Sequence, residues 1–158
     1  MLFPTLQFAL FFGLTLLLHR TLPLRARSGI LLGASLIFYA LWIPPYLLLL
    51  IGDILVNYLL LQGIVRGRHK KLWLTASILF TLGLLGGFKY AIPILEGVSV
   101  WWGVHSGMQP IWPEVILPLG ISFYSFQIIG FAVDAYRGEE TAQRVPLARY
   151  ALFISFFP

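Results

Sequence analysis

Long apolar stretches separated by short polar connections set the pattern of hydrophobic and polar positions along the chain. A helix needs about 20 apolar residues to cross a bilayer, and about 17 at the short limit. We therefore predict an all-α fold, a polytopic transmembrane helical bundle with about five complete spans and the start of a sixth. The predicted spans cover residues 3–18, 29–43, 46–64, 72–95, 115–133 and 150–158.

Proline and glycine mark the ends and interruptions of these spans. The pair Pro44-Pro45 should end the second span, because a residue before proline is pushed out of the helical region. In the fifth span, Pro118 removes a backbone donor and Gly120 permits close approach of another helix. Small residues inside the fourth span should likewise let a neighbouring helix pack closely. These are Gly83, Gly86 and Gly87.

Composition supports a membrane protein and excludes several soluble classes. Hydrophobic residues make up 59% of the 158 residues and charged residues 11%, whereas soluble domains carry about a quarter of charged residues. A soluble domain of this size would still expose about 30% of its unfolded surface. A disordered tail and a disulfide-stapled module are excluded as well. The absence of cysteine rules out a thiolate nucleophile or metal ligand.

Ten of the 11 lysine and arginine residues lie in three of the connections between spans. The remaining one, Lys89, lies late in the fourth span. The positive-inside rule makes those three connections cytoplasmic and puts the N-terminus outside. Because the charges are spread over short loops, we do not expect nucleic acid as a partner. The ten residues in the connections are Arg20, Arg25, Arg27, Arg66, Arg68, Lys70, Lys71, Arg137, Arg144 and Arg149.

Polar residues at bilayer depth are candidates for function by default. Asp53 and Asn57 are four residues apart and share one helix face. They would serve either as an interhelical hydrogen-bonding pair or as part of a functional site, and both alternatives remain open. Lys89 would extend its ammonium to the outer interface, or pair with Asp53 or Glu96.

The fifth span carries the most informative pattern. Gly120, Tyr124, Gln127, Phe131 and Asp134 are spaced 4, 3, 4 and 3, which puts them on one helical stripe that should face the bundle or a cavity. The end of this stripe, with Asp134, Tyr136 and Arg137, marks the cytoplasmic exit of the span. Asp134 and Arg137, three residues apart, would form a weak ion pair or simply mark the end of the span.

No catalytic or metal-binding constellation is visible in the sequence. His19, His69 and His105 lie in loops or at span edges and have no partner at metal or triad spacing. The sixth stretch holds nine residues, about 13 Å of a core about 30 Å thick. We therefore expect the N-terminal part of a longer membrane protein. The residues alone leave open an enzyme, a transporter or channel subunit, and a structural membrane partner.

Several segments resemble the membrane-bound O-acyltransferase family. The string LPLGISFYSFQ, which ends at Gln127, is followed by the box Asp134-Ala135-Tyr136-Arg137-Gly138. The family has a similar pair of motifs, with threonine where Ser125 stands. ALFISFFP, SLIFYALW and GFKY are weaker matches. The similar branch is bacterial and includes the alginate O-acetyltransferase membrane subunit and the D-alanyl transfer protein of teichoic acids.

The resemblance implies a ring of tilted helices around a tunnel through the bacterial inner membrane. An acyl donor, an acyl-thioester carrier or acetyl-CoA, would enter from the cytoplasmic side. The acceptor would be a hydroxyl of an exported polysaccharide or cell-wall polymer, or a periplasmic acyltransferase partner. The family's essential histidine would lie beyond Pro158, so residues 1–158 would form the N-terminal part of one acyltransferase domain, inactive alone. The candidate tunnel-lining residues are Tyr124, Ser125, Gln127, Asp134, Tyr136 and Arg137.

Overall fold

The computed structural model describes residues 6–21, 23–42, 44–91, 93–95, 97–98, 100–101 and 120–155. The described residues are almost entirely helical and include no strand, which confirms the all-α prediction. The elements are α1 (Leu6–Thr21), α2 (Leu24–Trp42), α3 (Pro44–Arg66), α4 (Lys70–Gly86), the π-helical η1 (Gly87–Ala91), α6 (Ile121–Arg137), α7 (Glu140–Gln143) and α8 (Leu147–Ser155).

Two helices are long and apolar enough to cross a membrane. They are Pro44–Arg66, with 23 residues, and Lys70–Leu95, with 26 residues. By contrast, α1 has 16 residues and α6 has 17, which corresponds to about 24–26 Å of a core about 30 Å thick. The predicted count of five spans is therefore not confirmed. Residues 102–119, which include Pro118, lie outside the described part of the chain.

The helix boundaries correct the predicted loops. Arg20 lies in α1, Arg27 in α2 and Arg137 in α6, so the basic residues belong largely to helix ends rather than to connections. Arginine is a good helix former, and its long side chain can extend toward water from a helix end. Pro44 and Pro45 do separate α2 from α3, and they form the first turn of α3, where proline needs no backbone partner.

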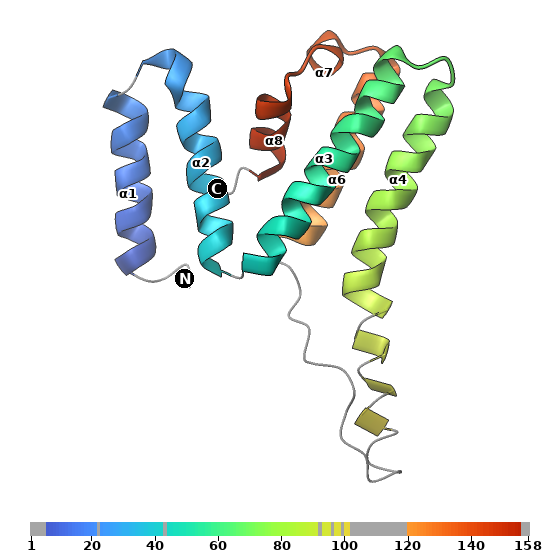
Figure 1. Cartoon of the computed structure of the whole chain (residues 1–158), viewed down its shortest axis with the longest axis horizontal. Helices are drawn as coiled ribbons and strands as arrows, with labels where there is room; N and C mark the ends of the chain where they lie inside the picture. The colour runs from blue at the N-terminus through green and yellow to red at the C-terminus, as the bar shows by residue number, and fades with distance from the viewer. Residues whose placement is uncertain are drawn as a thin grey trace.

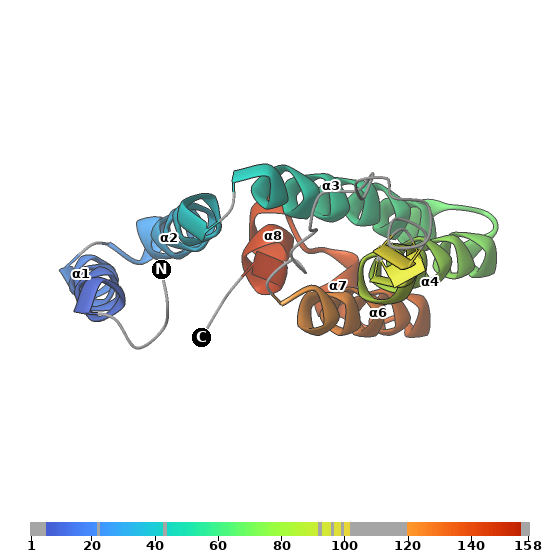
Figure 2. The same cartoon turned by 90° about the horizontal axis from the view of Figure 1, so that it is seen from below.

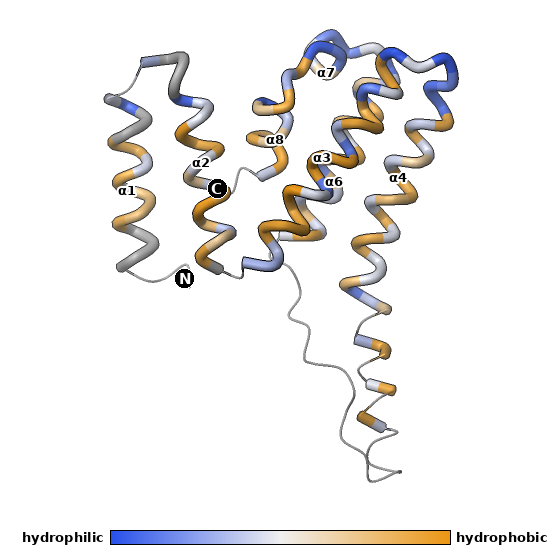
Figure 3. The backbone as a smooth tube through the Cα atoms, viewed as in Figure 1, coloured by the Kyte–Doolittle hydropathy of each residue, from blue (hydrophilic) through white to orange (hydrophobic). Residues whose placement is uncertain are grey.

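All three turns that carry basic residues lie at the same end of the molecule. Figure 1 shows the α1–α2, α3–α4 and α6–α8 connections all at the top, with the α1–α2 connection apart from the other two. In Figure 3 this end is hydrophilic where coloured, whereas the middle of the helices is mostly hydrophobic. The segregation of charge predicted from the sequence is therefore present in three dimensions. Which side of a membrane this end faces stays a prediction.

The helices are packed unevenly across the molecule. α3 and α4 form an antiparallel hairpin, and α6 packs against both of them (Figures 1 and 2). The short α8 contacts α2, α3 and α6, whereas α1 packs against α2 at the far side. Exposed leucines on α1, such as Leu10, Leu14 and Leu17, are suited to contact lipid. The buried core therefore lies among α3, α4, α6 and α8.

Close helix contact occurs at other glycines than those predicted in the fourth span. A Cβ atom added at Gly83, Gly86 or Gly87 would have no neighbour within 4 Å, so these residues face open space. On α3, however, a Cβ at Gly63 would lie 2.5 Å from Cδ2 of Trp73, the indole from α4. A Cβ atom added at Gly67 would lie 2.8 Å from Nε1 of the same indole. In the α3–α4 hairpin, the Trp73 indole thus packs directly against positions 63 and 67, where glycine leaves room for the ring.

Gly120 agrees with its prediction. It precedes α6 in a left-handed conformation, with φ of 72°, which residues with a Cβ rarely adopt. A Cβ atom at this position would lie 3.2 Å from the Tyr39 hydroxyl of α2. Backbone geometry and the close approach of another helix therefore both favour glycine here.

Replacement of Gly63 by valine should destabilise the α3–α4 hairpin. The added side chain overlaps the Trp73 ring, and overpacking of this kind typically costs about 1–3 kcal/mol. The matched control is Gly52→Val on the same helix, where an added Cβ meets nothing within 4 Å. Denaturant unfolding in detergent, followed by circular dichroism, measures both variants. Equal stability of the two variants would contradict the packing argument.

Candidate functional site

A buried polar network joins α3 to α4. The Asn57 amide nitrogen donates hydrogen bonds to Oδ1 of Asp53 at 2.8 Å and to the Asp53 backbone oxygen at 3.1 Å. The Asn57 side-chain oxygen accepts hydrogen bonds from the hydroxyls of Ser77, at 2.8 Å, and Thr81, at 3.3 Å. All four side chains are 1–2% exposed. The Asn57 amide nitrogen thus bonds within α3, and its oxygen connects α3 to α4.

This network contains the interhelical hydrogen bonds that one of the two alternatives for Asp53 and Asn57 predicts. One atom is left over: Oδ2 of Asp53 is buried and has no hydrogen-bond partner in the described part of the chain. Tyr124 of α6 and Tyr150 of α8 lie close enough to Asp53 for electrostatic interaction. Lys89 lies elsewhere, exposed and 5.4 Å from the ring centroid of Tyr90, and no described ion pair joins it to Asp53.

The buried face of α6 is offset from the predicted stripe. Tyr124 is buried as expected, Gln127 and Phe131 lie half-buried at the edge, and Asp134 is exposed. The buried residues are centred about one residue further along the helix, and one residue turns the helix by about 100°. Gln127 and Phe131 therefore fall at the edge of the buried face and Asp134 outside it. The residues that are buried on α6 are Ile121, Tyr124, Ser125, Ile128, Ala132 and Ala135.

A cavity of about 420 Å³ opens where α2, α6 and α8 meet, and we name it the Gln127 cavity. Its lining residues are Leu31, Gln127, Arg149, Leu152 and Phe153. The Gln127 side-chain oxygen is buried without a hydrogen-bond partner in the described residues. An unpaired amide oxygen in a largely apolar cavity is able to accept a hydrogen bond from a ligand hydroxyl or amide.

Aromatic contacts hold α8 in place as one wall of this cavity. The Phe131 ring of α6 lies 5.2 Å from Tyr150 and 5.5 Å from Phe153, measured between centroids. Tyr58 of α3 lies 5.6 Å from Tyr150, and its hydroxyl donates a 3.3 Å hydrogen bond to the Val145 carbonyl. Aromatic pairs at these separations add about 0.5–1.5 kcal/mol beyond their buried area. The position of the nine-residue α8 is thus set by these aromatic contacts with α3 and α6.

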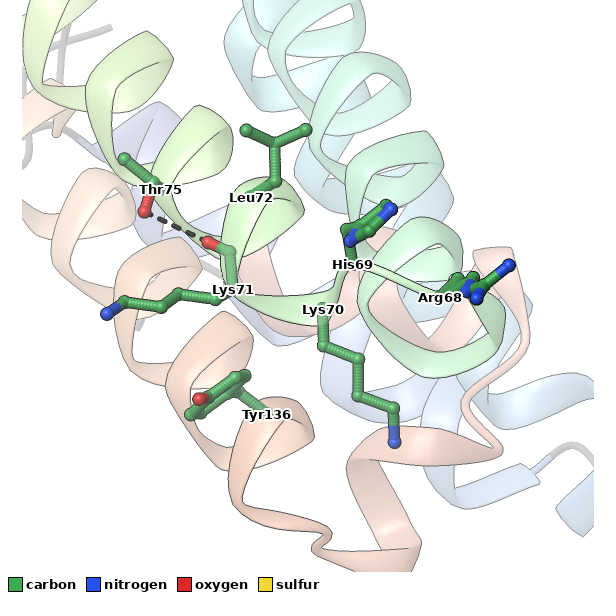
Figure 4. Close-up of a pocket in the computed structure, with 7 residues that line it drawn as sticks. All are labelled: Arg68, His69, Lys70, Lys71, Leu72, Thr75 and Tyr136. Carbon is green, nitrogen blue, oxygen red and sulfur yellow. Dashed lines mark hydrogen bonds between the residues drawn. The ribbon is translucent and has the colours of Figure 1, made fainter.

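A larger, open cavity of about 1070 Å³ lies at the basic end of the molecule (Figure 4), and we name it the turn cavity. Tyr136 of α6 lines it, together with the α3–α4 turn and the first residues of α4. Arg137, in contrast, is exposed and lines neither cavity. Within the described chain, no ion pair joins it to Asp134. The lining residues are Arg68, His69, Lys70, Lys71, Leu72, Thr75 and Tyr136.

The histidines and acidic residues that the structure describes include no candidate metal site. The described residues contain no group of three or more His, Cys, Asp or Glu side chains that could hold a metal ion. His19 lies in α1, His69 precedes α4, and His105 lies outside the described part of the chain.

Sequence reasoning missed the partners from other helices. Ser77 and Thr81 were not singled out, although their spacing of four on an otherwise apolar helix signals a polar patch on one face. Arg149 was treated only as a topological charge, yet it lines the Gln127 cavity. Leu31 carried no distinguishing signal, because it is one apolar residue among many on α2.

Comparison with known proteins gives several relatives. The chain is 36% identical over 156 residues to the probable alginate O-acetylase AlgI of Azotobacter vinelandii, covering 94% of this chain and 30% of that protein. It is 37% identical over 142 residues to the protein of the same name from Pseudomonas aeruginosa, covering 85% and 26%. With the peptidoglycan O-acetyltransferase of Helicobacter pylori it shares 33% identity over 151 residues, covering 79% and 28%.

These relationships identify the chain's family. The chain belongs to the membrane-bound O-acyltransferase family. It spans less than a third of the length of these relatives. No protein-family model matches the chain, and no solved structure matches it. The family resemblance seen in the span-five string is thus confirmed by relatives that match most of the chain.

Replacement of Asn57 by leucine should weaken the α3–α4 pairing in this family member. The change removes the amide and leaves the Ser77 and Thr81 hydroxyls without their acceptor, so we expect a loss of about 1–3 kcal/mol. Gln62→Leu on the same helix is the control, because no described hydrogen bond involves its side chain. Unfolding by sodium dodecyl sulfate measures both variants. A loss in Gln62→Leu as large as in Asn57→Leu would contradict the assigned role.

Proposed function

We propose that the chain is the N-terminal portion of a membrane O-acyltransferase that transfers an acetyl group to hydroxyls of an exported polysaccharide or cell-wall polymer. The observation that carries this proposal is the similarity to an alginate O-acetylase over 94% of the chain. A relative named as a peptidoglycan O-acetyltransferase supports a polymer acceptor more broadly. These names favour acyl transfer over a transporter, a channel subunit or a structural partner.

The proposed donor is an acyl thioester, either acetyl-CoA or an acyl-thioester carrier, that arrives on the cytoplasmic side. The acceptor hydroxyl oxygen attacks the thioester carbonyl, so that a C–O bond forms and the C–S bond breaks. The hydroxyl proton passes to a base and the thiol departs. Such a reaction needs a general base near the hydroxyl and hydrogen-bond donors for the developing oxyanion. To this chain we assign positioning of substrates rather than the proton transfer.

The Gln127 cavity supplies a physical basis for that positioning. The unpaired Gln127 oxygen would accept a hydrogen bond from a substrate hydroxyl or amide group. The apolar walls formed by Leu152 and Phe153 would reduce access of water to the thioester. Arg149 at the same cavity would attract a negatively charged group of the donor. The lining residues favour Arg149 for this role over Arg137, which is one of the candidate tunnel-lining residues named from the sequence.

In the proposed orientation the basic end of the molecule faces the cytoplasm and the N-terminus lies outside. The membrane would be the bacterial inner membrane, and the acetyl group would leave on its outer side. There it would pass to the polymer or to a periplasmic acyltransferase partner. Tyr124 and Ser125 are buried on α6, within one helical turn of Gln127. We propose that they line the path between the two sides of the membrane.

Loss of the gene that encodes this chain should remove ester-linked acetyl groups from an exported polymer. The measurement is acetate released by mild base from purified exopolysaccharide and from peptidoglycan. We expect one of the two fractions to lose most of its acetate and to regain it on complementation. Unchanged acetate in both fractions would contradict the proposed function.

In the complete protein, Gln127→Leu should lower acetyl transfer by roughly tenfold, the effect of losing one well-placed hydrogen bond of about 1.4 kcal/mol. The control is Phe126→Leu. Phe126 is the preceding residue of α6, is 65% exposed and points away from the core. Protein level and helix content should match the unmodified protein in both variants. Full transfer activity in Gln127→Leu would remove Gln127 from the proposed path.

A further inference from the structure

The turn cavity presents an unusual concentration of unpaired positive charge. Arg68, Lys70 and Lys71 are three cations among four successive residues, all exposed and all lining the cavity. No carboxylate is among the lining residues. Within the described chain, none of the three side chains forms an ion pair or a hydrogen bond. Like charges this close repel one another, so an anion that binds among them gains from all three.

Lys70 and Lys71 of α4 point in different directions, and the Tyr136 hydroxyl of α6 lies in the space between them. In Figure 4, Tyr136 of α6 lies between the extended side chains of Lys70 and Lys71 at the start of α4, while Arg68 and His69 project on the other side of the turn. The phenol can donate a hydrogen bond, and each ammonium can donate three. These hydrogen-bond donors, with no carboxylate among the lining residues to pair with them, fit a phosphate group.

The start of α4 adds a weaker contribution to the same field. His69 is its N-cap and forms no side-chain capping hydrogen bond. The first backbone N–H groups of a helix carry partial positive charge. This feature supports anion binding but does not carry the argument, which depends on the cationic lining and the cavity.

The surroundings of the cavity distinguish a lipid headgroup from a free phosphate. The cavity lies where the apolar helices Pro44–Arg66 and Lys70–Leu95 are joined, at the hydrophilic end of the molecule (Figure 3). Leu72 also lines the cavity and is 66% exposed, and its side chain points away from Tyr136 (Figure 4). A ligand among the cations therefore lies at a hydrophilic end that continues directly into two apolar helices. A phospholipid has the matching amphiphilic shape.

We propose that the turn cavity binds the phosphate headgroup of an anionic phospholipid, held beside Tyr136 between Lys70 and Lys71, with its acyl chains extending along the apolar part of the hairpin. Such a site goes beyond acyl transfer and does not depend on it. It would fix the α3–α4 hairpin at one depth in the membrane, with α6 held through Tyr136. The proposal separates a localised lipid site from charges that merely set topology.

The test is lipid binding to the delipidated full chain in detergent, measured by native mass spectrometry. Phosphatidylglycerol, phosphatidylcholine and inorganic phosphate are titrated separately. Two adjacent lysines at a surface contribute about 1 kcal/mol each, so the double variant Lys70→Gln/Lys71→Gln should bind phosphatidylglycerol roughly tenfold to thirtyfold more weakly. The control Lys89→Gln/Arg144→Gln removes the same net charge from exposed residues outside the cavity and should keep the affinity.

Tyr136→Phe should weaken phosphatidylglycerol binding by a smaller factor, about threefold to tenfold, because one donor is lost. Circular dichroism confirms that each variant keeps its helix content. Equal weakening in the lysine pair and in the control pair would show non-specific attraction and overturn the proposal. So would equal affinity for phosphatidylglycerol and phosphatidylcholine. Binding of inorganic phosphate with the same lysine dependence, but no preference for phosphatidylglycerol, would assign the cavity to a free phosphate and overturn the lipid assignment.

Discussion

The hydrogen bonds of Asn57 hold together the helix pair on which the rest of the molecule is assembled. An apolar bundle offers few directional contacts, because leucine packs against lipid about as well as against another leucine. The amide that bridges Asp53 on α3 to Ser77 and Thr81 on α4 supplies direction and register. Once α3 and α4 are held in this register, α6 packs against both of them. Both cavities form on elements that this hairpin positions.

The two cavities depend on the hairpin in different ways. The turn cavity forms directly at its connection, where α3 ends and α4 begins, and Tyr136 closes it from α6. The Gln127 cavity is one step removed, because its wall α8 is attached through the aromatic contacts of Tyr58, Phe131 and Tyr150. The turn cavity has three cations among its lining residues and lies at the hydrophilic end. The Gln127 cavity combines apolar side chains with the unpaired Gln127 oxygen and one cation, Arg149. The cation-rich cavity and the cavity proposed for acyl transfer thus lie at different places along α6.

The sequence predicted the helical class, the segregation of charge and the importance of the fifth span, because each depends on local pattern alone. It did not predict the helix boundaries, since α2 begins ahead of Arg27, before the apolar span starts, and α6 continues to Arg137, after the apolar span ends. Neither could it locate the buried face of α6 to within one residue, because polar residues such as Gln127 lie at the edge of that face rather than at its centre. Partners such as Ser77 or Arg149 come from other elements, and only tertiary packing brings them to Asn57 and Gln127.

The contact of the Trp73 indole with Gly63 of α3 and with Gly67 of the following turn has an evolutionary consequence. A side chain at position 63 and an indole at position 73 cannot occupy the same space. The two positions should therefore change together among relatives, with a larger residue at 63 accompanied by a smaller one at 73. Such paired replacement would preserve the distance between α3 and α4 while the residues that set it are exchanged. The quantity under selection is then the width of the hairpin rather than the identity of either residue.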